Sequence, residues 1–341
     1  MKIIKKLSLG IFAVSILISC GKGTKKETES ISNEAQNQPN IVFILSDDQS
    51  WTDYSFMDDK NIETPRIDQF AKESLTFTRG YVPTPLCSPS LASIITGLYP
   101  KDHGVLGNDK VYERVKGNRK ESQKNRAEAY KPVISAFEKQ TTLPDMLKAK
   151  GYLSFQTGKW WHGNHKIGGF DYGMTHGDPK RGGRHGDFGL TIGRKGLDTI
   201  NSYVDVALKE KKPFFLWYAP FLPHRPHNPP ARLFEKYKKK TDSEHLAKYW
   251  AMIEWFDETC GELFDLIEDK GLTENTLFVY VCDNGWKQDP TKSGYMKVSK
   301  RAPYDLGIRT PIMYKWAGKI TPKMNTETIT SSIDMVPTVL D

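Results

Sequence analysis

Cysteine is scarce in this chain, with four residues among 341. A small disulfide-bonded scaffold needs more cysteines in a shorter chain, so the sequence excludes that class. Cys260 falls in a helical pattern and Cys282 ends an apolar run, and both are expected to be buried thiols. Nucleic-acid-binding motifs are also lacking, so no nucleic-acid partner is predicted. The formal net charge of +8 suits an anionic substrate without specifying one.

The first apolar run is too short to span a bilayer on its own. It covers residues 7–18, follows three lysines and ends just before Cys20, which is the pattern of a secretory signal. Residues 17–20 resemble a bacterial lipobox, so we expect a signal peptide over 1–20 and a lipid on Cys20; a plain signal peptide cleaved nearby is the alternative. Residues 21–38 are almost free of apolar side chains, which predicts a disordered tether. The sequence thus predicts an exported bacterial lipoprotein, anchored to a membrane in the periplasm or at the cell surface.

Short apolar runs alternate with helical patterns along the rest of the chain. The runs predict buried strands at 41–45, 153–156, 214–218, 277–282 and 312–316. Apolar residues at three- and four-residue spacing predict helices at 64–75, 141–150, 196–211 and 243–270. Strands that alternate with helices predict an α/β fold, with a mostly parallel central sheet sandwiched by helices.

Polar residues follow four of these predicted strands. In strand order they are Asp47 and Asp48, Lys159 and His162, His224, and Asp283 and Asn284. Open α/β sheets build their sites beyond the carboxyl ends of the strands, so the four groups are predicted to converge in one pocket. The carboxylate and amide oxygens are hard ligands that select Ca²⁺ or Mg²⁺ over zinc. Taken singly, an acidic pair also caps helices and Asn-Gly also forms turns.

Cys87 opens the run Cys-Ser-Pro-Ser, which begins an apolar stretch ending at Thr-Gly. An inert buried thiol is the simplest explanation of this cysteine alone. Together with the two acidic pairs, however, the run resembles the formylglycine-dependent sulfatases of the alkaline phosphatase superfamily. The resemblance spans about residue 39 to the end, and implies a sulfatase catalytic domain over 39–341. It also implies a bound Ca²⁺, with Mg²⁺ as the alternative. The implied ligands are Asp47, Asp48, Asp283, Asn284 and the residue derived from Cys87.

The resemblance implies that a formylglycine-generating or sulfatase-maturing enzyme oxidises Cys87 to 3-oxoalanine (formylglycine). The aldehyde would hydrate to a diol, of which one hydroxyl attacks sulfur and the other then expels sulfate. Leu91 is a departure, since the family signature usually has arginine there, where it holds the aldehyde and is read by the modifying enzyme. The departure fits a divergent active subfamily or a protein that has lost activity, and the intact remainder of the site favours the former.

The stretch Gly-Lys-Trp-Trp-His that contains Lys159 resembles the family's Gly-Lys-Trp-His element, with one extra aromatic residue. It implies that Lys159 contacts sulfate and that His162 takes a proton from the diol, with His165 as the fallback. Pro-His-Arg-Pro resembles the family's Pro-His-x-Pro element and implies that His224 lies at the bridging oxygen. Lys300 matches a second sulfate-binding lysine, so either Lys300 or His224 would protonate the leaving group.

A glycine-rich stretch at 163–196 has little helix or strand pattern, and is expected to be an ordered loop that walls the site. The alternative is a surface loop that takes no part in the site. Arg184 and His185 on this loop, and His227, are candidate substrate contacts. Export, basic surface stretches and aromatic residues near the site favour a sulfated carbohydrate as substrate.

Two rival functions remain open at this point. One is a phosphate or phosphonate monoester hydrolase on the same fold, and the other is a non-catalytic, sulfoglycan-binding lipoprotein. The chain stops at Asp341 within a helical pattern, whereas sulfatases normally continue into a smaller C-terminal subdomain. We therefore expect that subdomain to be truncated.

Overall fold

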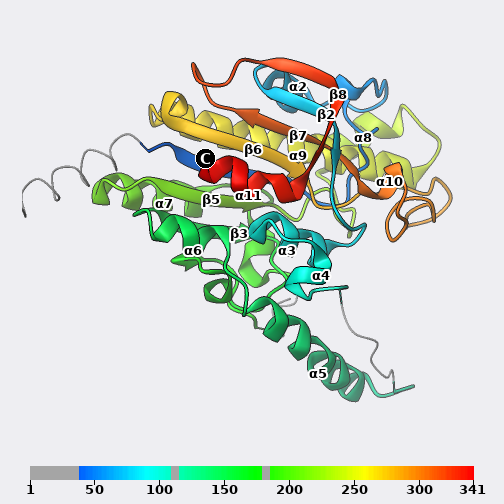
Figure 1. Ribbon diagram of the computed structural model, residues 1–341. Coiled ribbons are helices and arrows are strands. Elements are labelled where there is room, and N and C mark those ends of the chain that lie inside the picture. Colours follow the sequence, from blue (N-terminus) through cyan, green and yellow to red (C-terminus); the bar gives the residue numbers. More distant parts are fainter. Residues whose placement is uncertain (1–37, 109–114, 179–184) are drawn as a thin grey trace, which may run out of the picture.

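An eight-stranded sheet forms the centre of the protein in a computed structural model, which describes residues 38–108, 115–178 and 185–341 (Figure 1). In this part of the chain the strand order is β4-β3-β5-β1-β6-β7-β2-β8. The strands are β1 (Asn40–Ser46), β2 (Leu75–Tyr81), β3 (Leu153–Gly158), β4 (Tyr172–Gly173), β5 (Phe214–Ala219), β6 (Thr276–Cys282), β7 (Arg309–Lys315) and β8 (Lys323–Ser331). The helices are α2 (Pro65–Lys72), α3 (Cys87–Thr96), α4 (Pro100–His103), α5 (Arg119–Phe137), α6 (Leu143–Lys148), α7 (Asp198–Glu210), α8 (Ala231–Lys238), α9 (Glu244–Asp269), α10 (Asp305–Ile308) and α11 (Met335–Leu340).

Most neighbouring strands in the sheet are parallel. β1 pairs in parallel with β5 and with β6, and β3 pairs in parallel with β5. β7 is the exception, because it is antiparallel to both β6 and β2. The five predicted strands are present as β1, β3, β5, β6 and β7, and the predicted α/β fold with a mostly parallel sheet is confirmed.

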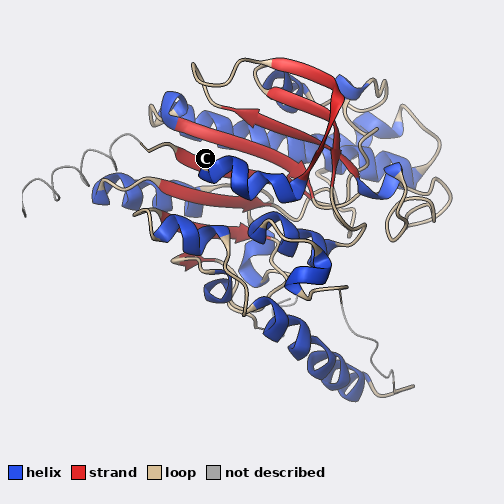
Figure 2. Cartoon of the chain, in the orientation of Figure 1, coloured by secondary structure: helices blue, strands red, loops and turns tan. Residues whose placement is uncertain are grey.

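Helices cover both faces of the sheet (Figure 2). Successive side chains of a strand point to opposite faces, so Phe43 of β1 belongs to one apolar cluster and Ile44 to the other. The first cluster includes Leu91 of α3 and residues of α5, α6 and α11, and the second includes Phe256 of α9 and residues of α2 and α7. A strand buried on both faces is apolar throughout, which explains why β1 is recognisable in the sequence.

The four predicted helices are present as α2, α6, α7 and α9, and local signals mark where three of them begin. Thr142 and Asp145 form a capping box at the start of α6, and the Ser243 side chain accepts a hydrogen bond from the Leu246 backbone N–H at the start of α9. α7 begins two residues later than predicted, because Gly196 has a left-handed backbone (φ 87°) that a helix cannot include.

Cys260 and Cys282 are buried free thiols, as predicted. Across the described ranges, no helix is both long enough and apolar enough to cross a membrane. The signal peptide, Cys20, the tether up to residue 37 and Arg184 lie outside the described residues. What the sequence predicts for them therefore stays a prediction.

Candidate active site

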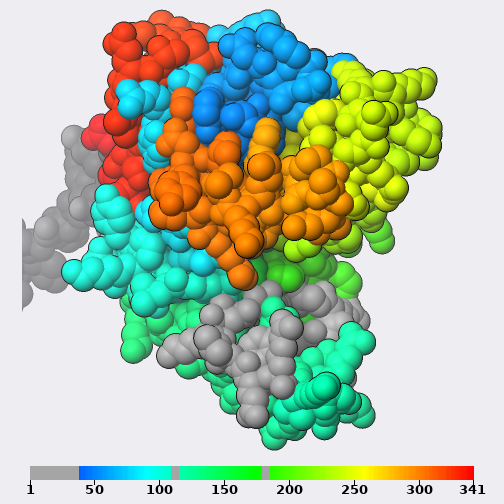
Figure 3. All heavy atoms as spheres, turned by 90° about the vertical axis from the view of Figure 1, so that its right-hand side faces the viewer, coloured from blue at the N-terminus to red at the C-terminus, as the bar shows by residue number. Residues whose placement is uncertain are grey.

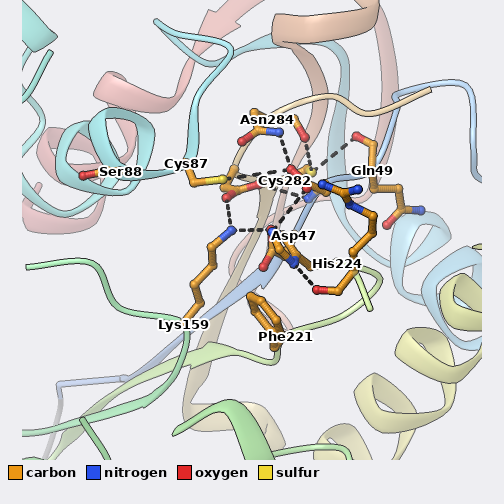
Figure 4. Close-up of polar contacts among 12 residues, drawn as sticks. Asp47, Gln49, Cys87, Ser88, Lys159, Phe221, His224, Cys282 and Asn284 are labelled. Carbon is orange, nitrogen blue, oxygen red and sulfur yellow. Dashed lines mark hydrogen bonds and ion pairs between the residues drawn. The ribbon is translucent and has the colours of Figure 1, made fainter. Parts of the chain in front are cut away.

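The carboxyl ends of the central strands bring distant polar side chains together. Ser46 at the end of β1 lies opposite Cys282 at the end of β6, so Asp47 and Asp283 leave neighbouring strands at the same level and Asp48 follows directly. The backbone N–H of Asp48 donates to Oδ1 of Asp283 across this gap (3.2 Å). The close-up in Figure 4 shows Asp47, Cys87, Lys159, His224 and Asn284 in one cluster, and Figure 3 views the molecule from the side on which these strands end.

Two buried lysines neutralise most of the acidic charge. Nζ of Lys159 forms ion pairs with Oδ1 of Asp47 and with Oδ2 of Asp283, the latter at 3.0 Å. Nζ of Lys300 forms an ion pair with Oδ1 of Asp48 and lies 3.1 Å from Sγ of Cys87. With all three carboxylates ionised, the two ammonium groups leave one net negative charge in a site with little solvent, and burial raises the pKa of Asp47 well above its ordinary value. Such a charge is stable only when it is paired, so the cluster has room for a further cation.

The oxygens in this cluster fit a hard divalent cation. Carboxylate oxygens of Asp47, Asp48 and Asp283 all lie within 4.8 Å of one another. Oδ2 of Asp47, Oδ2 of Asp48 and Oδ1 of Asn284 are buried and have no hydrogen-bond partner among the described residues. Buried acceptors without partners are costly, and Ca²⁺ and Mg²⁺ prefer this type of oxygen ligand. Four of the five residues predicted to hold the metal, Asp47, Asp48, Asp283 and Asn284, are therefore gathered in one place.

Cys87 is the first residue of α3 and points its sulfur into the cluster. Its Sγ lies 4.0 Å from Oδ1 of Asp48, and its side chain is almost fully buried. Burial raises the pKa of the Cys87 thiol to about 12, so the residue is a neutral thiol at neutral pH. A neutral thiol is a weak nucleophile. The N-terminus of a helix, however, stabilises negative charge on a group placed there, and Cys87 holds that position in α3.

Leu91 lies one helical turn after Cys87 on the same face of α3. Its side chain is 1% exposed and packs in the apolar cluster between the sheet and α3. The position at which the family usually has arginine is therefore apolar here.

His224 lies opposite Asp48, within the segment that joins β5 to α8. Its Nδ1 is 2.5 Å from the carbonyl oxygen of Arg225, so Nδ1–H donates to that carbonyl and Nε2 faces Oδ2 of Asp48 at 3.5 Å. Burial lowers the pKa of His224 well below its ordinary value, and the imidazole is neutral. Burial alone would raise the pKa of Asp48, but the ammonium groups of Lys300 and Lys159 outweigh that effect and lower it.

The structure does not bring His162 into this cluster. Its ring stacks on Phe137 of α5, with centroids 4.0 Å apart, and meets Trp160 edge-on at 5.1 Å. Burial lowers the pKa of His162 to about 3. The fallback, His165, has its Nδ1 2.9 Å from the carbonyl oxygen of Thr175. The extra aromatic residue after Lys159 shifts the histidine into the apolar layer, and Lys159 alone of this element reaches the site.

The glycine-rich stretch forms one side of the site, as far as it lies within the described residues. The His185 ring lies 5.8 Å from that of Phe221, which in turn lies 4.1 Å from the His224 ring. His227 is held elsewhere on the same segment, against Tyr249 at 5.3 Å. Of the predicted substrate contacts, His185 is thus adjacent to His224, and His227 lies on the segment that carries His224.

Arg194 is a residue of this site that the sequence does not reveal. Its guanidinium donates to the carbonyl oxygen of Phe221 through Nη2 (2.6 Å), and to Oδ1 of Asn228 through Nη1 (2.7 Å). It therefore fixes the segment that carries His224. Arg194 comes from an irregular loop with no periodic pattern, so no sequence signal marks it.

Comparisons with known proteins identify the class. The fold is that of the alkaline phosphatase superfamily, and a crystal structure of a sulfatase from Pseudoalteromonas sp. shares it with a TM-score of 0.67 and 22% identity, over 92% of this chain and 71% of that one. The family model described as Sulfatase matches residues 39–341, and the chain belongs to the sulfatase family.

Two curated relatives extend this finding. The chain is 25% identical to an ulvan-active sulfatase of Formosa agariphila, covering 95% of this chain and 65% of the relative. It is 26% identical to human N-acetylgalactosamine-6-sulfatase, covering 90% of this chain and 62% of the relative. The match thus spans less than two thirds of each relative's length.

Proposed function

We propose that the protein hydrolyses sulfate esters of sulfated carbohydrates, with a formylglycine made from Cys87 by a sulfatase-maturing enzyme. The observation that carries this proposal is the position of Cys87 at the start of α3. Its sulfur is 3.1 Å from Lys300, inside a cluster of three carboxylates and two buried lysines. The family assignment supports the reaction, and the names of the ulvan and N-acetylgalactosamine relatives support the substrate class.

Ca²⁺ held by Asp47, Asp48, Asp283 and Asn284 would supply positive charge beside the aldehyde-derived hydroxyl and polarise the ester. The added cation would change the net charge of the cluster from one negative to one positive. That charge complements a sulfate monoester, which carries one negative charge, better than a phosphate monoester, which carries up to two.

The residues of the chain itself divide the remaining work. The ammonium groups of Lys159 and Lys300 would stabilise charge on the sulfate oxygens, where burial strengthens each interaction. His224 is neutral and carries its proton on Nδ1, so its Nε2 would accept a proton within the site, and the ammonium of Lys300 would deliver the proton that the bridging oxygen of the leaving group needs. Arg194 would keep His224 in place through the Phe221 carbonyl.

Turnover of paired chromogenic esters tests this proposal. Protein produced together with a maturing enzyme and supplied with Ca²⁺ should cleave 4-nitrophenyl sulfate faster than 4-nitrophenyl phosphate. Faster cleavage of the phosphate would instead favour a phosphate or phosphonate ester hydrolase. The comparison uses one protein preparation, so differences in folding or maturation do not affect the ratio.

A second function, non-catalytic binding of sulfated glycans, is favoured by one observation, the apolar residue at position 91. Leu91→Arg should raise the share of chains that carry an aldehyde, because it restores the residue that the modifying enzyme reads in this family. Peptide mass spectrometry measures that share, and Leu91→Met is the matched control. An unchanged share in Leu91→Arg would show that position 91 does not limit maturation.

Export and membrane anchoring through Cys20 form part of the same proposal and rest on the sequence alone. A lipid-anchored enzyme would hold its catalytic domain close to the membrane while it degrades an external polymer. Labelling with a lipid precursor, compared between the native chain and Cys20→Ala, addresses this point directly.

A further inference from the structure

Arg225 is an exposed arginine at the edge of the site, next to His224 in sequence. Its guanidinium carbon lies 5.1 Å from the centre of the Trp286 ring. Nζ of Lys300, which contacts Cys87, lies 5.7 Å from the centre of the same ring. Trp286 and Lys300 both belong to the segment between β6 and α10, which is orange in Figure 3. Arg225 and Lys300 therefore both lie beside the same indole ring, which places Arg225 near the reaction centre.

The charge of Arg225 is uncompensated within residues 38–108, 115–178 and 185–341. Two other exposed arginines in these ranges do have carboxylate partners, Arg66 with Asp265 and Arg232 with Glu258. Arg225 has no carboxylate partner there, and its guanidinium group lies over the ring of Trp286. An arginine held by an aromatic ring keeps its N–H groups in a fixed plane, and they suit an oxyanion with two oxygens.

Arg225 is also coupled to the position of His224. Its carbonyl oxygen accepts the hydrogen bond from Nδ1 of His224, so the backbone of Arg225 holds the orientation of the His224 ring. A group bound by the Arg225 side chain would consequently sit in a fixed position relative to the histidine and to the Lys300 ammonium.

We propose that Arg225 forms an anionic subsite that binds a second oxyanion, a carboxylate or a further sulfate, on the substrate whose sulfate ester lies at Cys87. This inference rests on the proposed function. In the cluster itself, the scissile sulfate balances the single positive charge that remains once a divalent cation is bound. The positive charge of Arg225 is not needed to neutralise the scissile sulfate, so it is available to a second acidic group on the substrate. The site would therefore favour densely charged polysaccharides over singly sulfated ones.

Packing alone is the competing explanation, in which Arg225 only covers the Trp286 ring. Arg225→Met separates the two explanations, because methionine keeps an apolar side chain over the indole and removes the charge. A purely structural role predicts the same preference among anions in both proteins.

Binding measurements on protein that also carries Cys87→Ala test the inference without any turnover. The probes are phenyl sulfate, 4-sulfooxybenzoate, which adds a carboxylate, and benzene-1,4-diyl bis-sulfate, which adds a sulfate. In titration calorimetry with Ca²⁺ present, at least one doubly charged probe should bind about tenfold more tightly than phenyl sulfate, as a charge-assisted hydrogen bond provides. Arg225→Met should remove this advantage, and Arg232→Met, a control at an arginine paired with Glu258, should retain it.

The pattern of tight binding identifies the second group. An advantage for the benzoate probe alone indicates a carboxylate, as in a uronic acid, and an advantage for the bis-sulfate alone indicates a second sulfate. Equal affinities for all three probes, or an advantage that survives Arg225→Met, would overturn the inference. Because the measurement needs no catalysis, failure of the proposed sulfatase activity would be seen separately, in the nitrophenyl sulfate assay.

Discussion

Cys87→Ala is expected to abolish turnover of 4-nitrophenyl sulfate while the fold remains intact. Loss of a covalent nucleophile typically reduces kcat by roughly 10⁴-fold or more. The structural cost is small, because alanine is the best helix former and removes one sulfur atom from the start of α3. Lys300 loses its contact with Sγ but keeps its ion pair with Asp48.

Cys260→Ala is the matched control for this experiment. Cys260 is equally buried, but it belongs to α9, in the apolar cluster on the opposite face of the sheet from α3. It should therefore retain the parent rate per folded molecule, as judged by circular dichroism and initial rates. Turnover that persists in Cys87→Ala would show that the nucleophile is another residue.

Asp283→Ala is expected to give the second largest effect, a loss of roughly 10³-fold or more that added Ca²⁺ does not restore. Asp283 interacts with two partners at once, since Oδ2 pairs with Lys159 and Oδ1 accepts from the Asp48 backbone N–H. Its removal therefore takes away a metal ligand and releases the lysine that would bind sulfate. Rates measured from micromolar to tens of millimolar Ca²⁺ test both consequences.

Two further variants help to interpret that result. Asp283→Asn keeps the acceptor for the Asp48 N–H but removes the charge, so it isolates the electrostatic contribution from the backbone contact. Asp265→Ala removes an exposed carboxylate that pairs with Arg66 on the surface, and should leave the rate unchanged. Full recovery of Asp283→Ala at high Ca²⁺ would contradict the role assigned to Asp283.

The parts of the fold that the sequence predicts are those buried on both sides. β1, β5 and β6 are continuous apolar runs, because neither face of these strands meets water. β8 was missed, since most of its residues are exposed and it contains no apolar run. β2 is not predicted either, because only alternate residues are buried and two of those three, Thr76 and Thr78, are threonine.

Part of the candidate site can likewise be predicted from the sequence, and part of it depends on tertiary contacts. The polar residues after β1 and β6 were predicted to meet because parallel strands end at one edge, and they do meet. The pairing of Lys159 with Asp47 and Asp283 joins residues far apart in the chain, and no local pattern encodes it. The displacement of His162 depends on Phe137 of α5 packing against its ring, which is also a tertiary effect.

The most direct test of the account is mass spectrometry of the peptide containing Cys87, from protein purified from its own organism, alongside the rate of sulfate ester cleavage by the same preparation. The account predicts a peptide of lower mass, in which an aldehyde has replaced the thiol, and a rate proportional to the aldehyde fraction. An active preparation in which Cys87 is entirely thiol would contradict it.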